Sequence, residues 1–230
     1  MFCNQCGAQV ADGTKYCPSC GQPVDLGAGT PVAPAPPWVP PSNVEVRIGY
    51  WIGEGWKIVK ADMFTFVIIS LLYLVVSGIV PIILQGAMTA GMHIACMVVI
   101  LRGKAEIGDV FKGFNYFVPT LVACILVSLF TFIGFLLCII PGFVVIAMYF
   151  FVYMFIVDRR MDFWPAMEAS HSIVKQNYLG FTLLLLAFMG LHIVGLLACI
   201  VGILVTIPIQ YAALTVAYRD IVGFHRTSID

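Results

Sequence analysis

Four cysteines near the start of the chain have the residue type and spacing that metal chemistry needs. Cys3 and Cys6 form one CxxC pair, and Cys17 and Cys20 form a second. Zinc prefers four soft ligands in a tetrahedron, and a CxxC turn presents two thiolates to one metal. Because cysteine fills every position, no coordination site is left for water. The spacing therefore predicts a structural Zn2+ site within residues 1–25, with no catalytic role.

Disulfide bonds are the alternative use of these cysteines. They require an oxidising compartment, because the reducing cytosol keeps thiols free for metal. The charges farther along the chain, described below, predict that this segment lies in the cytosol, which favours zinc.

The same segment resembles the short zinc-ribbon domains that begin many bacterial and archaeal proteins. The letters "CNQCG" and "YCPSCG" match the two knuckles of that family, and the resemblance covers residues 1–24. It implies that the four cysteines are the ligands and that nothing in the segment is catalytic. Some zinc ribbons bind nucleic acid, but this one sets Lys15 against Asp12 and Asp25. Since four thiolates also make a zinc centre negative, no nucleic-acid partner is expected.

The rest of the chain is far more apolar than a soluble domain. Of its 230 residues, 61% are apolar and 10% are charged, against roughly 45–50% and about 25% in soluble proteins. Residues 63–101, 113–157 and 176–218 contain no Asp, Glu, Lys or Arg. Each block is about twice the ~20 residues that one membrane-spanning helix needs. The blocks predict an all-α integral membrane protein with six transmembrane helices in three hairpins, surrounded by the lipid bilayer.

Composition divides the chain into three predicted parts. These are a zinc ribbon at 1–25, a proline-rich linker at 26–43 and a six-helix membrane domain at 44–230. The prolines favour an extended, semi-rigid linker. Within the membrane domain, the spans are predicted near 63–84, 86–102, 118–138, 141–157, 178–197 and 200–218. Their tight turns are predicted at Gln85–Gly86, at Pro141–Gly142 and around Gly202.

Amphipathic segments precede each hairpin, at 44–61, 106–117 and 162–176. They are predicted to be helices in the membrane interface, where tryptophan and lysine are favoured. Trp51 and Trp56 fall on the apolar face of the first segment, although its glycines weaken the helix prediction.

An internal repeat supports this organisation. "KIVKADMFTF" (57–66) matches "SIVKQNYLGF" (172–181) at an offset of 115 residues, and "GFLLCIIPGFVV" (134–145) matches "GLLACIVGILV" (195–205) at an offset of 61. Chance similarity between apolar runs is the alternative, but the shared polar landmarks favour a true repeat. The predicted unit is an interfacial helix followed by a hairpin, used three times.

Charges predict the orientation of the hairpins. With the spans above, every charged residue lies before the first span or after the second, fourth or sixth. Those places share one side of the membrane, and Lys and Arg mark the cytoplasmic side. Both termini are therefore predicted to be cytoplasmic, in the inner or cell membrane of a prokaryote.

Residues 49–223 also resemble a group of uncharacterised prokaryotic six-helix membrane proteins. The membrane domain attached to some glycerophosphodiester phosphodiesterases is similar. The phrases that carry the resemblance are "IIPGFVV", "VDRRMDFWPAMEAS" and "VGILVTIPIQYAALTVAYRDIVG". The resemblance implies a fold and no reaction.

Two classes of function remain open, and neither is enzymatic, because no nucleophile triad, phosphate loop or paired carboxylate is found. In the first, the ribbon is a docking or regulatory head for a cytosolic protein partner. In the second, the bundle transports a small solute past polar groups at His93, Gln85, Gln210, Thr89 and Thr206. His93 and His192 are read either as proton relays or as neutral groups bonded to neighbouring helices. The near absence of charge within the spans favours the docking head.

Overall fold

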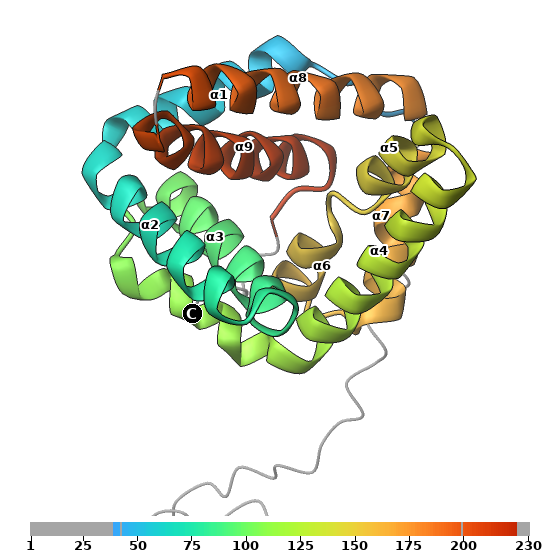
Figure 1. The fold of residues 1–230 in the computed structure, drawn as a ribbon, viewed down its shortest axis with the longest axis horizontal. Helices are drawn as coiled ribbons and strands as arrows, with labels where there is room; N and C mark the ends of the chain where they lie inside the picture. Colours follow the sequence, from blue (N-terminus) through green and yellow to red (C-terminus); the bar gives the residue numbers. More distant parts are fainter. Residues whose placement is uncertain (1–38, 42, 199, 225–230) are drawn as a thin grey trace, which may run out of the picture. The chain divides into compact units, whose positions relative to one another are not determined.

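Alternating amphipathic and charge-free segments set the order of the helices. The structure is a computed structural model that describes residues 39–41, 43–198 and 200–224, and every regular element in these ranges is helical (Figure 1). In order, the elements are α1 (Ile48–Ala61), α2 (Met63–Ile79), α3 (Pro81–Arg102), the 3-10 helix η1 (Ile107–Tyr116), α4 (Phe117–Leu137), α5 (Ile139–Met148), α6 (Val152–Asp158), α7 (Phe163–Val174), α8 (Tyr178–Leu197) and α9 (Ile200–Ile221). The chain divides into two units, residues 1–39 and 40–230, and the helices named above belong to the second.

Within residues 40–230, three segments with the same order of helices follow one another. Each segment begins with a surface helix (α1, η1 or α7) and continues, after a break of a few residues at most, into apolar helices that pack on each other. In each segment the second residue of the first apolar helix is exposed and the fourth is buried. The exposed residues are Phe64, Val118 and Leu179, and the buried ones are Phe66, Thr120 and Phe181. The three helix starts therefore share one pattern of exposure.

Several of these helices are suited to a membrane. Within the described residues, four helical segments are long and apolar enough to cross one: α3, η1 with α4, α5 with α6, and α8. A fifth is added if α1 and α2, which meet at 101°, are counted as one bent span. The length and composition of the described helices therefore support four or five spans, and the six-span topology stays a prediction.

The three turns within the hairpins lie earlier than predicted. The sequence prediction put them at Gln85–Gly86, Pro141–Gly142 and Gly202, whereas the helices break at Val80, at Cys138 and between Leu197 and Ile200. Two of the prolines that suggested turns are instead in the first turn of the helix that follows, Pro81 at the first position of α3 and Pro141 at the third position of α5. Proline suits that turn because its missing N–H has no helical partner there.

Glycines that suggested turns are contacts between helices. A Cβ on Gly86 of α3 would meet the backbone of Thr120 on α4, and one on Gly202 of α9 would meet the backbone of Gly195 on α8. Gly134 and Gly142 approach each other in the same way between α4 and α5. Small residues let membrane helices pack closely, so these glycines belong inside the hairpins.

The predicted span at 141–157 is broken. Helix α5 ends at Met148 and α6 starts at Val152, which frees backbone groups in the interior. The buried side chain of Ser170, on α7, compensates: its Oγ donates to the carbonyl of Met148 at 2.7 Å and accepts from the N–H of Phe151 at 3.2 Å. A break in a helix is tolerated in a buried position where other protein groups bond to the freed backbone groups.

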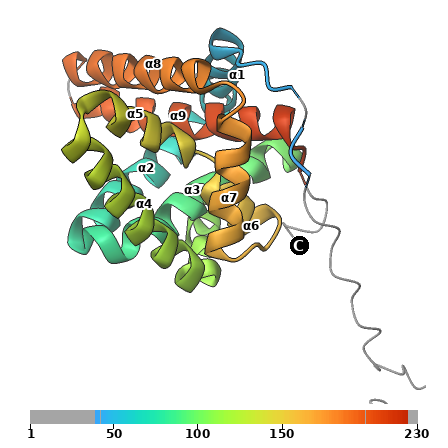
Figure 2. The ribbon, with the colours of Figure 1, turned by 90° about the vertical axis from the view of Figure 1, so that its right-hand side faces the viewer.

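Helices α3 and α9 form the interior of the bundle. Helix α9 lies between α8 and α3 in both views (Figures 1 and 2). Residues 86–99 of α3 are buried without interruption. They include Gly91, where a Cβ would collide with the backbone of Val110 in η1. The surface helix η1 therefore lies directly against the central helix.

Candidate functional site

The segment that connects the predicted metal module to the helices is fixed where it reaches them. The side-chain amide of Gln176, just after α7, donates to the carbonyl of Pro41 at 2.7 Å. Val44 is 5% exposed and lies in the core. The chain is thus held on the helical unit at Pro41, near the end of the predicted linker, and at Val44, before α1 begins.

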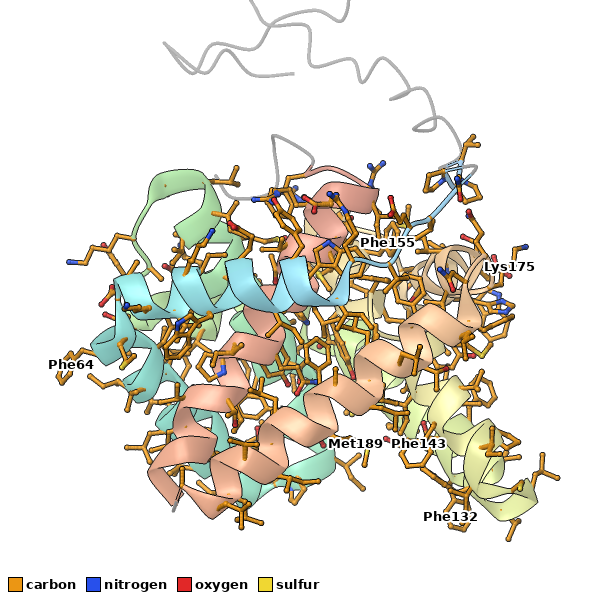
Figure 3. The ribbon with its side chains drawn as sticks, turned by 90° about the horizontal axis from the view of Figure 1, so that it is seen from above. Phe64, Phe132, Phe143, Phe155, Lys175 and Met189 are labelled. Carbon is orange, nitrogen blue, oxygen red and sulfur yellow. The ribbon has the colours of Figure 1, made fainter. Side chains whose placement is uncertain are left out.

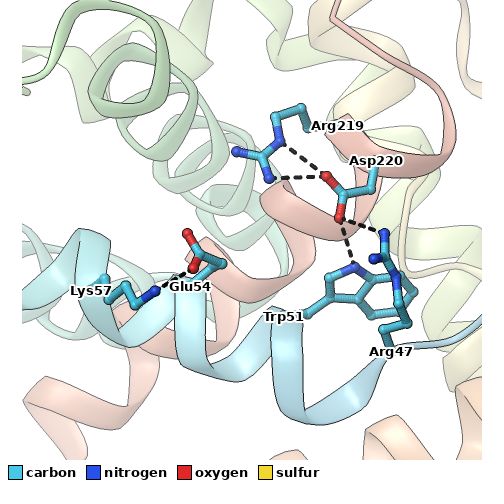
Figure 4. A network of polar contacts seen from close by, with 6 residues as sticks. All are labelled: Arg47, Trp51, Glu54, Lys57, Arg219 and Asp220. Carbon is cyan, nitrogen blue, oxygen red and sulfur yellow. Dashed lines mark hydrogen bonds and ion pairs between the residues drawn. The ribbon is translucent and has the colours of Figure 1, made fainter.

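Helix α1 is attached to the end of α9 by one carboxylate. The indole N–H of Trp51 donates to Oδ2 of Asp220 at 3.1 Å, and Nη2 of Arg47 lies 3.5 Å from the same oxygen (Figure 4). The guanidinium of Arg219 donates to Oδ1 at 2.9 and 3.1 Å. Trp51 is 1% exposed, and its ring stacks on Phe181 of α8 with centroids 6.4 Å apart. A charge-assisted bond to a buried donor is among the stronger polar contacts, so this cluster fixes α1 on the bundle.

One side of α1 packs tightly on α9. A Cβ on Gly55 would meet the backbone of Ala213, so the glycine that weakened the helix prediction allows a close approach. The apolar face was predicted to include both Trp51 and Trp56, but Trp56 is 41% exposed and points away from the core. On the outer side, Nζ of Lys57 lies 2.6 Å from the carboxylate of Glu54 (Figure 4), and this hydrogen bond raises the pKa of Lys57.

A second carboxylate is bound in a related way at the end of α6. The hydroxyl of Tyr218 on α9 donates to Oδ2 of Asp158 at 3.0 Å, and Asp158 is 2% exposed. The repeat register sets Asp158 and Arg159 against Arg219 and Asp220. Tyr218 thus donates to the acid at the end of α6, and Trp51 donates to the acid at the end of α9.

A buried polar cluster joins α2, α3 and α9. Nδ1 of His93 lies 3.1 Å from Oγ1 of Thr215, and that hydroxyl donates to the carbonyl of Tyr211 at 2.8 Å. Because Thr215 uses its proton on the carbonyl, His93 donates from Nδ1. The hydroxyl of Tyr211 donates to that of Tyr73 at 2.9 Å, and Tyr73 lies 3.5 Å from Oγ1 of Thr89. The cluster satisfies its own polar groups, which is what a buried network needs to be stable.

Only some residues of the predicted transport path come together. His93 and Thr89 are in the cluster, and Thr206 is buried beside Gly195. Gln85 is exposed, and Gln210 is only partly buried; Gln210 shares a side-chain hydrogen bond with His192, which was not part of the predicted path.

Sequence reasoning missed Tyr73, Tyr211 and Thr215. A signal was present: Tyr211 and Thr215 are four residues apart on α9, as Thr89 and His93 are on α3. Two polar pairs at this spacing, each on one face of an apolar helix, predict partners across a helix interface.

The cysteines of the membrane domain differ in their surroundings. Cys96 and Cys124 are buried in α3 and α4, whereas Cys138 is exposed at the turn before α5. Among the described residues no group of three or more His, Cys, Asp or Glu side chains could hold a metal ion.

Comparison with known proteins separates the start of the chain from the rest. Residues 2–24 match the family model of the zinc-ribbon domain. This segment is a zinc ribbon. The chain is also 33% identical over 136 residues to an uncharacterized protein of Mycobacterium bovis, and equally to uncharacterized proteins of two strains of Mycobacterium tuberculosis. These matches cover 59% of this chain and 42% of each relative, so the chain spans well under half of their length. No solved structure matches.

The zinc ribbon carries the predicted ligands Cys3, Cys6, Cys17 and Cys20, and all four lie outside the described residues. Their chemistry fits zinc, because four thiolates are a complete tetrahedral ligand set. Metal held in this way supplies the folding energy of a small domain and leaves no position for substrate.

Proposed function

We propose that this protein is an integral membrane protein of a prokaryotic cell that presents its zinc ribbon to the cytosol as a docking head for a protein partner. The role is non-catalytic, and the six apolar helices or helix pairs are spans with both termini on the cytoplasmic side. The observation that carries this proposal is the fixed base of the linker. Pro41 and Val44 contact the helical unit and α1 is attached to α9, so a partner bound to the ribbon would be held at the bundle.

The distribution of charge supports the orientation. Charged side chains lie on or beside α1, η1 and α7 and at the end of α9, whereas the turns at Val80 and Cys138 are in charge-free stretches. Side-chain nitrogen and oxygen atoms are frequent around α1, Phe155 and Lys175, while the region of Phe132, Phe143 and Met189 is mostly carbon (Figure 3). A single polar end is what a bundle with all its connecting helices on one side requires.

Native Cys138 offers a test of the orientation. A membrane-impermeant thiol reagent is added outside intact cells. It should label Cys138 in a chain whose Cys199 is replaced by Ser. It should miss a single cysteine introduced at Lys104. Labelling at position 104 from outside, with Cys138 protected, would reverse the orientation.

The docking role is tested by full-length chains captured from mildly solubilised membranes. The wild type should recover a partner that is lost from a Cys3→Ser/Cys6→Ser chain and from a chain without residues 1–30, with membrane insertion equal in all three. Elemental analysis should find about one zinc in the wild type and none in the other two. Recovery of the same partners by all three chains would transfer the function to the bundle.

Transport is the second candidate, and the buried cluster of His93, Thr215, Tyr211, Tyr73 and Thr89 is the observation that favours it. An ionisable group inside a membrane often marks a solute or proton path. Here the polar groups of the cluster bond to one another. The five residues come from the segments 63–101 and 176–218, which contain no Asp, Glu, Lys or Arg. A solute flux that a correctly folded His93→Phe chain loses would establish transport and displace the docking role.

A further inference from the structure

The junction between α1 and α2, called here the elbow and comprising residues 56–64, has an unusual geometry. The helices meet at 101° across one non-helical residue, Asp62. If α2 crosses the membrane, α1 runs nearly parallel to its surface. The elbow then lies at the depth of the lipid headgroups, so the inference that follows rests on the proposed membrane insertion.

Three exposed side chains with complementary chemistry occupy the elbow at four-residue intervals. Trp56 is 41% exposed and Phe64 is 78% exposed, and Lys60 is exposed between them in sequence. Phe64 projects away from the bundle (Figure 3). An indole prefers the headgroup region, a phenyl ring prefers hydrocarbon and an ammonium prefers phosphate.

The charge of Lys60 is not neutralised by its neighbours. Lys60 forms no salt bridge with any residue that the structure describes, whereas nearby Lys57 is bound to Glu54 at 2.6 Å. Asp62 is the acid within the elbow, but its Oδ2 atom is buried without a hydrogen-bond partner, so that oxygen is turned inward. The elbow therefore presents a free cation beside an aromatic anchor.

The corresponding elbow between α7 and α8 differs. The 115-residue offset sets Lys175 against Lys60 and Leu179 against Phe64, but it sets His171 against Trp56. Nε2 of His171 is 3.0 Å from the hydroxyl of Tyr178, so this ring is engaged within the protein. A free cation and an exposed indole are thus combined at the first of these two elbows and not at the second.

We propose that the elbow binds the headgroup of an anionic phospholipid in the leaflet that contains the surface helices. The ammonium of Lys60 pairs with the lipid phosphate, the ring of Trp56 lies among the headgroups and Phe64 enters the acyl region. Bound lipid would hold α1 in the plane of the interface and so steady the base of the linker.

Fluorescence quenching by brominated lipid tests this proposal. The full chain is reconstituted in nanodiscs of phosphatidylcholine with phosphatidylglycerol as a minor component. Two samples are compared, one with brominated phosphatidylglycerol and one with brominated phosphatidylcholine, and the brominated lipid has the same mole fraction in both. The signal of Trp56 is obtained by subtracting that of a Trp56→Phe chain. Brominated phosphatidylglycerol should be enriched about fivefold at Trp56 over its bulk fraction, as one interfacial lysine can achieve. Lys60→Gln should remove the enrichment, and the matched control Lys57→Gln should keep it because Lys57 is already paired.

The outcomes separate this inference from the proposed function. Equal quenching of Trp56 by the two lipids, in discs that the chain enters normally, would overturn the lipid site alone. Quenching by neither lipid would mean that protein or water covers the elbow, which also overturns the site. A chain that enters no disc would overturn membrane insertion and this inference together.

Discussion

Helices α3 and α4 are both long and apolar, yet they occupy opposite environments. In the apolar part of α3, 78% of the residues are buried inside the bundle, against 22% for η1 with α4. Helix α3 is nevertheless the least apolar of the four candidate spans. In a soluble protein the more apolar helix would be inside. The reverse order is expected in lipid, where hydrocarbon accepts large apolar side chains and the interior is made of small residues and bonded polar groups.

The largest effect should come from a methyl group added to the interior helix. Gly91→Ala places a Cβ against the backbone carbonyl of Val110, which cannot move like a side chain. We expect a loss of about 3 kcal/mol in the free energy of unfolding, measured by denaturation in detergent micelles.

The matched control is on an outer helix. Gly190 of α8 is exposed, and its Cβ would meet nothing within 4 Å. Gly190→Ala should therefore be neutral or stabilise by up to about 1 kcal/mol, because alanine favours the helix. Equal losses for the two variants would contradict the difference between interior and outer helices.

The two membrane histidines sharpen the comparison. His93 is 1% exposed and bonded to Thr215. His192 is only partly buried: among the described residues its Nδ1 has no hydrogen-bond partner, and its one side-chain hydrogen bond is with the partly buried Gln210. His93→Phe should cost about 1–2 kcal/mol through lost hydrogen bonding, and His192→Phe less than about 0.5 kcal/mol. Denaturation of the two purified variants under identical conditions measures the difference. A larger loss at His192 would show that the cluster around His93 does not stabilise the bundle.

Helix existence was predictable from the sequence, but the interior was not. The charge-free blocks and amphipathic segments marked the helical regions, since hydrocarbon leaves the backbone few alternatives. The predicted positions of the turns were wrong because Pro81 and Pro141 lie in the first turns of helices. Gly86 lies where α3 packs on α4. Proline also suits the first turn of a helix and glycine also suits a close helix contact, and the neighbouring helix decides between these roles and a turn.

The candidate site was predictable to a different degree in its parts. The spacing of the four cysteines was sufficient for the zinc ribbon, and the family comparison confirms that domain at residues 2–24. The bond between Trp51 and Asp220 joins residues 169 positions apart. No local pattern specifies such a contact, because it depends on the packing of α1 on α9.

Trp51 tests whether that contact stabilises the base of the linker. Trp51→Phe keeps an aromatic ring beside Phe181 but removes the N–H that Asp220 accepts. Asp220 retains Arg47 and Arg219, so the lost hydrogen bond should cost only about 1 kcal/mol, and the smaller ring at this buried position adds a packing loss. Thermal unfolding is compared with Trp56→Phe, which makes the same change at an exposed indole. Equal midpoints would show that the ion pairs alone hold α1.

The smallest effect is expected at the exposed pair on the same helix. Glu54→Gln removes the carboxylate that binds Lys57, but water and salt screen such a pair strongly. The unfolding midpoint should not change measurably. The pKa of Lys57, raised in the folded protein by Glu54, should fall toward its ordinary value of 10.5 in the variant, as carbon-13 NMR of the lysine side chain would record. Because the folded pKa is the higher one, any stabilisation that the shifted lysine contributes is present at neutral pH and is lost as the pH rises through the lysine pKa. A clear loss of stability near pH 7 would show that this surface contact matters as much as the carboxylate contacts of Asp158 and Asp220.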